Sequence, residues 1–301
     1  MRIAVVGAGS WGSTFASLLA ERGHDVALAC RDPEQAQAIA ATGRNPRYAH
    51  DADLSRVRAL AGREAREALG EAELVCIAVP SAAFREVATA LPERSAPVLS
   101  LVKGFDPHSG RRLSAVVEGR PVAVLAGPNH AEEIALGLPA VAVIASADER
   151  LARHLQRAVM SPRFRVYTNR DILGVEVSTA AKNVIALAVG MNDGLGLGDN
   201  AKAAVVTRGL AEIRRIGGAL GGRPETFSGL AGMGDLMVTC WSRHSRNRRA
   251  GELIALGRTA EEAVREIGMT VEGITTAPVL RHLGRGLGLD LPITEAVCAV
   301  L

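Results

Sequence analysis

The stretch "EVSTAAKNVIALAVG" (176–190) contains the residue of this chain best suited to chemistry, Lys182. Its spacing is that of an apolar helix, yet Lys182 and Asn183 interrupt it. A buried ammonium is costly unless it is paired or serves a reaction, and an apolar pocket lowers its pKa toward the range of about 7–8 that suits proton transfer. A catalytic lysine is one interpretation of this pattern. The alternative is a surface lysine whose stem lies along apolar neighbours.

A glycine loop near the N-terminus indicates a dinucleotide site. "GAGSWG" (7–12) fits G-x-G-x-x-G through Gly7, Gly9 and Gly12, although the pattern alone can arise by chance in a chain with 32 glycines. The loop lies between an apolar run typical of a buried strand, residues 2–6, and a helix-like segment. A dinucleotide pyrophosphate needs this close backbone approach and a helix N-terminus. We therefore predict cofactor binding rather than a purely structural turn.

The end of the second strand distinguishes NAD from NADP. An NAD site usually has a carboxylate there for the ribose hydroxyls. Here "ACRDPE" places Arg31 first and Asp32 after it. A guanidinium suits a 2′-phosphate, and Asp32 could instead cap the following helix. The sequence favours NADP without excluding NAD.

Polar residues follow two further strand-like runs. One is Lys103, and the other group is Gly127, Asn129 and His130. Open α/β folds bind ligands at this edge of the sheet. The alternatives are a solvated loop lysine at 103 and a helix-start residue, rather than a general acid, at His130.

The second half of the chain offers an acid and a basic cluster. Asp235 lies among glycines and apolar residues in "GLAGMGDLMVTC" (229–240), where it could cap a helix or face a substrate hydroxyl or a catalytic ammonium. The run "SRHSRNRR" (242–249) could be a solvated face or a nucleic-acid contact. Because it is short and mixes serine and asparagine with arginine, a pocket for one phosphate fits it at least as well.

These residues need elements that position them. Strand-like runs alternate with helix-like segments up to about residue 170; they lie at 2–6, 25–30, 73–80, 97–104, 121–128 and 139–146, with a helix from about Pro33 and a polar stretch to about residue 60. This alternation predicts a doubly wound parallel sheet. Helical periodicity dominates afterwards, and Thr259 with Glu262 has capping-box spacing. We predict an α/β Rossmann domain over 1–171 that binds NAD(P), and an all-helical substrate domain over 172–301.

Composition narrows the class of protein. The 301 residues can bury two cores, and a net charge of +3 with nine aromatic residues gives no reason to expect nucleic acid. Four cysteines without metal-ligand spacing predict buried apolar residues and no metal site. We see no signal peptide and no run near the roughly 20 apolar residues of a membrane helix, so we expect a soluble cytoplasmic protein.

Several motifs together resemble a known family. In order they are "GAGSWG", "LVKG", "GPNHAEE", "FRVYTN", "AAKNVIALAVGMNDGLGLGDNAKAA", "TRGLAEI", "AGMGDLMVTC", "SRNRR" and "VEG". They resemble the NAD(P)-dependent glycerol-3-phosphate dehydrogenases of bacterial type across essentially the whole chain. The K-N-V-I-A, G-D-L-x-x-T-C and S-R-N-R-R blocks together are highly specific. The resemblance implies a Rossmann domain followed by a helical domain similar to the C-terminal domain of 6-phosphogluconate dehydrogenase.

The resemblance also implies roles for individual residues. Lys182 matches the catalytic lysine. Substrate contacts are implied for Lys103, Gly127, Asn129, Lys182, Asp235, Ser245, Arg246 and Asn247. Besides the glycine loop, cofactor contacts are implied for Ser10, Trp11, Arg31, Lys103, Ala131, Arg246 and Glu272.

Three features depart from the family pattern. Asn129 and His130 stand where the family often has threonine and phenylalanine, and "STAAKN" replaces a glycine-rich lead-in. The family continues with a further helical stretch beyond "PITEAVCAVL", which implies a truncated end or missing final helices.

The implied reaction is the reversible reduction of dihydroxyacetone phosphate to sn-glycerol 3-phosphate by NAD(P)H, with Lys182 giving and taking the proton. It supplies glycerol 3-phosphate for phospholipid synthesis, often in a homodimer. Asn183 is expected to orient the substrate or support a loop. The alternatives are a similar reductase acting on a sugar acid or keto acid, and a non-catalytic nucleotide sensor or RNA-binding protein.

Overall fold

The computed structural model describes residues 1–93 and 96–301, and the chain divides into two compact units. The first unit comprises Met1–Val102, Leu113–Leu125 and Asn129–Ile172, and the second comprises Lys103–Arg112, Ala126–Pro128 and Leu173–Leu301. Two short segments from the first half of the sequence are therefore grouped with the helical second half. They contain Lys103 and Gly127.

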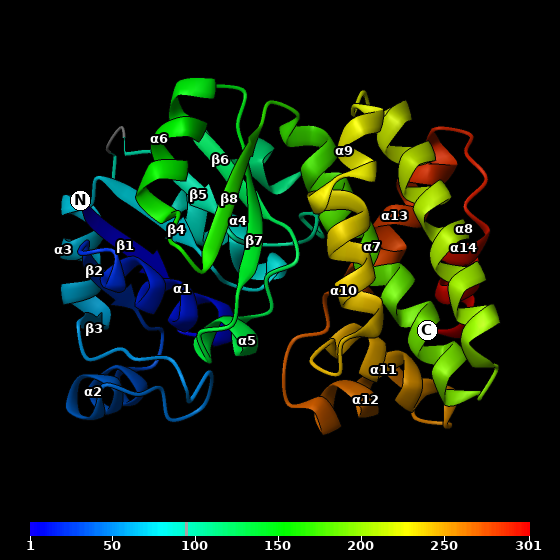
Figure 1. The fold of residues 1–301 in the computed structure, drawn as a ribbon, viewed down its shortest axis with the longest axis horizontal. Coiled ribbons are helices and arrows are strands. Elements are labelled where there is room, and N and C mark those ends of the chain that lie inside the picture. The colour runs from blue at the N-terminus through cyan, green and yellow to red at the C-terminus, as the bar shows by residue number, and fades with distance from the viewer. Residues whose placement is uncertain (94–95) are drawn as a thin grey trace. The chain divides into compact units, whose positions relative to one another are not determined.

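The first unit is built on one eight-stranded sheet, in the order β3-β2-β1-β4-β5-β6-β7-β8 (Figure 1). The strands are β1 (Arg2–Val6), β2 (Asp25–Ala29), β3 (Val57–Leu60), β4 (Leu74–Ile77), β5 (Val98–Ser100), β6 (Val122–Ala126), β7 (Ala140–Ala145) and β8 (Phe164–Asn169). Neighbours from β3 through β6 are parallel, and so are β7 and β8. The sequence did not indicate β3, because this four-residue strand lies within a polar stretch and includes the exposed Arg58.

Alternate side chains of the central strands bury against opposite faces of the sheet. Ile3 and Val5 belong to a core that includes Phe15, whereas Ala4 belongs to a separate core that includes Phe84. The helices of this unit are α1 (Ser10–Glu21), α2 (Pro33–Thr42), α3 (Gly62–Glu71), α4 (Ser81–Thr89), the 3₁₀ turn η1 (Leu113–Val116), α5 (Ala131–Ala135) and α6 (Glu149–Val159). A sheet buried on both faces explains its continuous apolar strands. The predicted doubly wound Rossmann fold is confirmed.

The second unit is a group of helices around one core (Figure 1). They are α7 (Ile172–Gly194), α8 (Gly198–Ala219), α9 (Pro224–Ser228), the π-helical turn η2 (Leu230–Gly234), α10 (Asp235–Trp241), α11 (Arg246–Ala255), α12 (Ala260–Ile267), α13 (Glu272–Gly286) and α14 (Pro292–Val300). The predicted capping box of Thr259 and Glu262 begins α12, and Gly268 ends it with φ of 67°. The helical second domain predicted from the sequence is confirmed.

Helix α7 is long and apolar enough to cross a membrane, contrary to the expectation from the sequence. The apolar length of α7 was missed in the sequence because Glu176, Lys182 and Asn183 interrupt the apolar run. Within its most apolar window, 83% of the residues are buried inside the fold. Its apolar side chains pack in the core of the second unit, so α7 is the central core helix of that unit.

Glycines let α11 lie directly on α7. A Cβ atom at Gly190 would come within 1.9 Å of the Arg248 carbonyl oxygen, and one at Gly251 would come within 2.0 Å of the Leu187 carbonyl oxygen. No side chain fits at such distances, so the two backbones contact each other at these positions. The contact fixes α11, whose first four residues belong to the arginine-rich run, relative to the helix that carries Lys182.

Candidate active site

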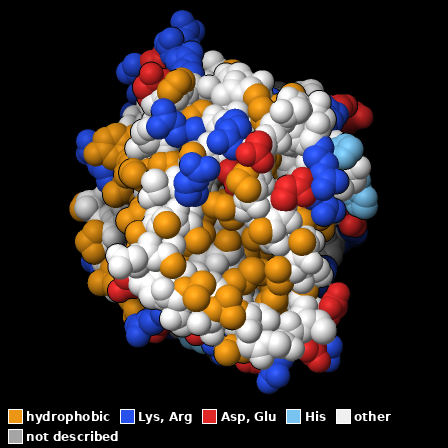
Figure 2. Space-filling view, turned by 90° about the vertical axis from the view of Figure 1, so that its right-hand side faces the viewer, with side chains coloured by type: hydrophobic (Ala, Val, Ile, Leu, Met, Phe, Trp, Pro, Cys, Tyr) orange, Lys and Arg blue, Asp and Glu red, His pale blue; other side chains and the backbone are white. Residues whose placement is uncertain are grey.

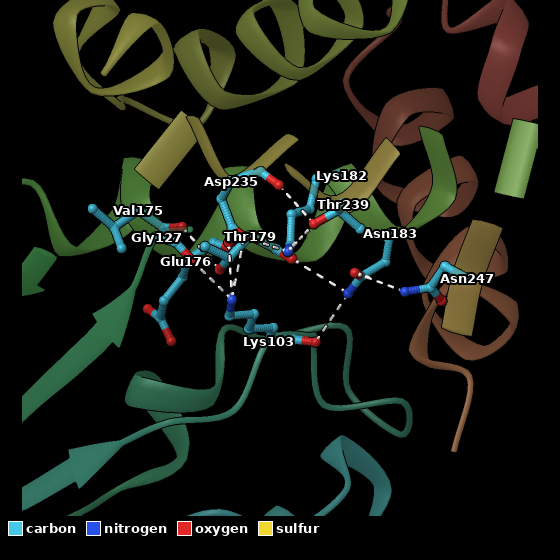
Figure 3. A network of polar contacts seen from close by, with 10 residues as sticks. All are labelled: Lys103, Gly127, Val175, Glu176, Thr179, Lys182, Asn183, Asp235, Thr239 and Asn247. Carbon is cyan, nitrogen blue, oxygen red and sulfur yellow. Dashed lines mark hydrogen bonds and ion pairs between the residues drawn. The ribbon is translucent and has the colours of Figure 1, made fainter. Parts of the chain in front are cut away.

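Lys182 is buried in the second unit between an acid and a hydroxyl. Only 4% of the residue is exposed. Its Nζ atom donates to Asp235 Oδ1 at 2.6 Å and to Thr239 Oγ1 at 2.6 Å (Figure 3). Asp235 and Thr239 lie one turn apart on α10, so both reach the same atom. The surface-lysine alternative is excluded, and Asp235 pairs with an ammonium rather than capping its helix, whose N-cap residue is Gly234.

A second ammonium, that of Lys103, reaches the same carboxylate. Lys103 Nζ lies 3.1 Å from Asp235 Oδ2 and also donates to the Gly127 carbonyl oxygen at 3.2 Å (Figure 3). Gly127 has φ of 122°, a conformation that side-chain-bearing residues rarely adopt. The segments that follow β5 and β6 thus place a cation and a carbonyl beside Asp235, as the sequence indicated for strand ends.

Burial, together with the charges of this cluster, sets the proton affinity of Lys182. Burial lowers the pKa of Lys182 to about 8; the Asp235 carboxylate opposes this shift and the Lys103 ammonium adds to it. Burial alone would raise the pKa of Asp235, but the Lys103 and Lys182 ammonium groups hold it below its ordinary value. The arrangement is an ionised carboxylate between two cations, and one of these cations can lose its proton near neutral pH.

Thr239 and Asn183 complete the cluster. Thr239 donates to the Asp235 carbonyl oxygen at 2.6 Å, which leaves its oxygen free to accept from Lys182. Sequence reasoning missed Thr239, although its i, i+4 spacing from Asp235 was a usable signal. Asn183 donates to the Lys103 carbonyl oxygen at 3.3 Å and accepts from Asn247 at 3.0 Å, which fits loop support rather than proton transfer.

The predicted phosphate residues lie around the start of α11. Ser245 is its N-cap residue and accepts from the Arg248 amide at 3.3 Å. Ser245 and Arg246 line a cavity of about 280 Å³, whose other lining residues are Arg243, His244, Arg249, Leu253, Glu266 and Ile267. Asn247 is buried. Its side-chain Nδ2 atom donates to Asn183, and its Oδ1 atom accepts from the backbone amide of Gly273 at 2.8 Å. A side-chain amide has two N–H donors, and the bond to Asn183 uses one of those of Asn247.

The glycine loop of the first unit is shaped for close backbone approach. A Cβ atom at Gly12 would lie 1.8 Å from the Gly7 carbonyl oxygen, and one at Gly7 would lie 2.6 Å from the Ala78 carbonyl oxygen. At Gly9, the N-cap residue of α1, such an atom would have no neighbour within 4 Å in the described part of the chain. Two of the three glycines are therefore required by the fold, whereas the space at Gly9 is available to a ligand. This fits the dinucleotide pyrophosphate predicted for the loop.

Two alanine substitutions in the glycine loop test its packing within the fold and its binding of the cofactor separately. Gly9→Ala is expected to leave the melting temperature unchanged and to weaken NADPH binding about tenfold or more, because the added methyl group occupies space reserved for the pyrophosphate. Gly12→Ala is expected to destabilise the protein by about 1–3 kcal/mol, as overpacking does. Thermal denaturation and NADPH fluorescence titration measure both. Full NADPH affinity in Gly9→Ala would contradict the assignment of the loop.

The end of β2 carries more positive charge than the sequence indicated. Arg31 is exposed, and Asp32 caps α2 by accepting from the Glu34 amide at 2.9 Å. Asp32 also pairs with Arg47 at 2.6 Å. The hydrogen bond from Glu34 is the largest influence that lowers the pKa of Asp32. The capping alternative for Asp32 is confirmed, and Arg47 is a second guanidinium at this edge that sequence spacing could not reveal.

The remaining predicted residues occupy defined places within their own units. Trp11 packs against Phe15 at 5.4 Å between ring centroids, and its buried Nε1 atom has no hydrogen-bond acceptor within residues 1–93 and 96–301. Ala131 begins α5, after the N-cap residue His130, which confirms the helix-start alternative for that histidine. Asn129 is buried, and Glu272 begins α13. Their ligand contacts stay predictions.

The chain matches a known family over nearly its full length. Residues 2–152 match the N-terminal part, and residues 171–301 the C-terminal part, of the family described as NAD-dependent glycerol-3-phosphate dehydrogenase. The chain belongs to this family. It is 48% identical over 305 residues to the glycerol-3-phosphate dehydrogenase [NAD(P)+] of Moorella thermoacetica, and 45% identical over 312 residues to that of Shouchella clausii. These alignments cover 99% and 100% of this chain and 91% of each relative.

A solved structure agrees with the fold. The crystal structure of glycerol-3-phosphate dehydrogenase from Coxiella burnetii is similar to this chain with a TM-score of 0.94 and 36% identity, over 99% of this chain and 94% of the other. Membership in the glycerol-3-phosphate dehydrogenase family implies a nicotinamide cofactor, NAD or NADP. The fit of the glycine loop to a pyrophosphate agrees with this.

Proposed function

We propose that the protein reversibly reduces dihydroxyacetone phosphate to sn-glycerol 3-phosphate with NAD(P)H. The observation that carries this proposal is the buried Lys182 ammonium, held between Asp235 and Thr239 beside a second cation. Residues 1–171 supply most of the cofactor contacts and residues 172–301 most of the substrate contacts. The family of the chain and the names of its relatives support the same reaction.

Lys182 is the proton donor in reduction and the proton acceptor in oxidation. The cofactor, when bound, supplies the hydride. As negative charge develops on the substrate oxygen, the Lys182 ammonium gives it a proton, and a donor with a pKa of about 8 does this readily near neutral pH. Asp235 keeps the amine oriented and protonated before reaction. Lys103 stabilises the developing oxyanion as a second positive charge.

Ser245, Arg246 and Asn247 bind the substrate phosphate. Their backbone lies at the N-terminus of α11, where amide groups favour an anion, and Arg246 adds a guanidinium at the adjoining cavity. Binding energy from the phosphate holds the carbonyl in place, although the phosphate does not react. Gly127 and Asn129 contact the carbon chain of the substrate.

NADP is the preferred cofactor. Arg31 is exposed at the end of β2, and the Arg47 guanidinium neutralises Asp32, which would otherwise repel a 2′-phosphate. Ser10, Trp11, Ala131 and Glu272 complete the cofactor contacts. Oxidation of NADPH and of NADH, followed side by side on adding dihydroxyacetone phosphate, tests both reaction and preference. No absorbance change with either cofactor would refute the proposed function.

Replacing Arg246 with alanine is expected to raise the KM for dihydroxyacetone phosphate about 10- to 100-fold, since a charge-assisted hydrogen bond contributes roughly 1.5–3 kcal/mol. Arg249→Ala is the matched control. Arg249 lines the same cavity, but its guanidinium is paired with Glu252 at 3.1 Å and Glu266 at 3.5 Å. Steady-state kinetics with saturating NADPH measures both variants. Equal KM values in wild type and Arg246→Ala would remove Arg246 from the phosphate site.

We further propose a cytoplasmic homodimer that supplies glycerol 3-phosphate for phospholipid synthesis. Apolar side chains gather over a broad part of the face in Figure 2, with basic side chains beside them. Apolar side chains gathered on a protein surface are typical of a site where another chain binds. Sedimentation velocity over a range of concentrations tests the dimer.

A further inference from the structure

Lysine is scarce in this chain, and its positions are informative. Among 35 lysine and arginine residues, only Lys103, Lys182 and Lys202 are lysines. All three lie in the second unit, and each ammonium contacts a carboxylate with little exposure. Two of them belong to the proposed active site. Lys202, on α8, has no role in the proposed reaction.

Lys202 belongs to a cluster of three charges that joins three helices. Its Nζ atom lies 2.9 Å from Asp193 Oδ2, and the same oxygen accepts from Arg248 Nη1 at 2.7 Å. The side chains of Lys202, Asp193 and Arg248 are 11%, 19% and 18% exposed. Pairs so little exposed are weakly screened by solvent, so they hold their geometry better than surface pairs. The cluster joins the end of α7 to α8 and α11.

The cluster also holds both ends of the turn 242–245, between α10 and α11. Lys202 Nζ lies 5.4 Å from the ring centroid of Trp241, the last residue of α10. Arg248 Nε donates to the Ser242 carbonyl oxygen at 3.4 Å, and the Arg248 amide donates to Ser245 Oγ. This turn leads directly into Ser245 and Arg246, at the cavity where the substrate phosphate is proposed to bind.

The identity of residue 202 fits this position. A lysine ends in a compact charge on an aliphatic stem, which fits between one carboxylate oxygen and the face of an aromatic ring. A planar guanidinium is wider and directs its donors in a fork. An arginine here would compete with Arg248 for the oxygen that both cations share. The chain uses arginine at nearly every other basic position, so the lysine at 202 is informative.

We propose that Asp193 and Lys202 are positioning residues that hold the turn 242–245, and so orient Ser245 and Arg246 toward the substrate phosphate. Neither residue contacts the reacting atoms. The inference rests on the proposed function for the identity of the phosphate ligand. It predicts that substitutions at these residues weaken activity on a ketone that carries the phosphate group and leave activity on a ketone without it unchanged.

The test compares Asp193→Asn and Lys202→Met with wild type on two ketones. With dihydroxyacetone phosphate, both variants are expected to show a KM about tenfold higher, with kcat unchanged. With dihydroxyacetone, which lacks the phosphate, kcat/KM is expected to equal that of wild type. If both substrates lose activity equally, or if neither KM changes, the positioning role is overturned.

Glu212→Gln is the matched control. Glu212 is buried in α8 and accepts from the Ile293 and Thr294 amides, so its loss perturbs the same helix away from the turn. It is expected to lower the melting temperature and to leave the ratio of the two kcat/KM values unchanged. Lys202→Met keeps the apolar stem, and it carries the test if Asp193→Asn does not fold.

Binding of inorganic phosphate, measured by calorimetry, separates this inference from the proposed function. Asp193→Asn and Lys202→Met are expected to bind phosphate about tenfold more weakly than wild type. If wild type binds phosphate but does not reduce dihydroxyacetone phosphate, the proposed reaction fails while the turn can still be tested. Equal phosphate affinity in wild type and both variants would overturn the positioning role directly.

Discussion

Lys182→Ala is expected to lower kcat for reduction of dihydroxyacetone phosphate by about 10²- to 10⁴-fold, the range that general acid–base catalysis contributes. The ammonium is the group held by Asp235 and Thr239, and its removal leaves the substrate oxygen without its proton donor. Lys103 stays beside Asp235, so the buried carboxylate keeps one cation. The defect should therefore be chemical rather than a collapse of the site.

Two measurements isolate the chemical step in this variant. NADPH fluorescence titration is expected to give the wild-type dissociation constant, because the glycine loop lies in the first unit. Adding a small primary amine is expected to restore part of the lost rate, since alanine leaves space where the lysine side chain was. An unchanged kcat, or a variant that no longer binds NADPH, would remove Lys182 from the proposed mechanism.

The sequence predicted the parts of the site whose signals are local. Lys182 was recognisable because a charge interrupts an apolar helix, and the glycine loop because three glycines stand between a strand and a helix. Burial at 4% exposure confirms the first of these signals. The close contact of Gly12 with Gly7 gives the second a physical reason. Each of these two features lies within a single segment of the chain.

Contacts between distant segments were beyond sequence reasoning. Lys103 and Asp235 are 132 positions apart, and only the family resemblance placed both at the substrate; neither segment by itself indicates that the Lys103 ammonium contacts the Asp235 carboxylate. Arg47, in the segment after α2, pairs with Asp32 at the start of that helix. Lys202 and Arg248 both contact a single oxygen of Asp193. The apolar length of α7 was underestimated because Glu176, Lys182 and Asn183 interrupt the run, and the helix lies inside the fold. Such pairings follow from packing, which periodicity and motif spacing do not encode.

The segment Lys103–Arg112 belongs to the second unit, so Lys103 lies in the same unit as Lys182. Lys103 follows a strand of the Rossmann sheet in sequence, yet Phe105 packs in the helical core and Arg112 pairs with Glu176 of α7 at 2.8 Å. The second cation is thus anchored to the helix that carries Lys182. The distance between the two ammonium groups, and hence their mutual repulsion, is set within one unit.

Asp235→Asn is expected to lower kcat/KM for reduction about 10²- to 10³-fold near pH 8 and to move its pH dependence to lower pH. Burial lowers the pKa of Lys182, the Asp235 carboxylate raises it, and the sum is about 8 in wild type. Reduction needs the protonated amine, so wild-type activity should fall as the pH rises through about 8, and oxidation should rise over the same interval. Without the carboxylate, nothing opposes the lowering of the Lys182 pKa by burial and by Lys103. The pH at which the reduction activity falls must therefore move below 8.

The comparison that decides this prediction is a pair of pH profiles of kcat/KM, measured from about pH 5.5 to 9.5. Thr239→Val is the matched control, because it removes the other acceptor of Lys182 and keeps the carboxylate. In this variant, the pH at which kcat/KM for reduction falls should stay closer to that of wild type. Breaking a buried ion pair costs about 3–5 kcal/mol, so each profile is recorded well below the melting temperature of the variant. If kcat/KM for reduction by Asp235→Asn falls at the same pH as in wild type, or at a higher pH, Asp235 does not control the proton of Lys182.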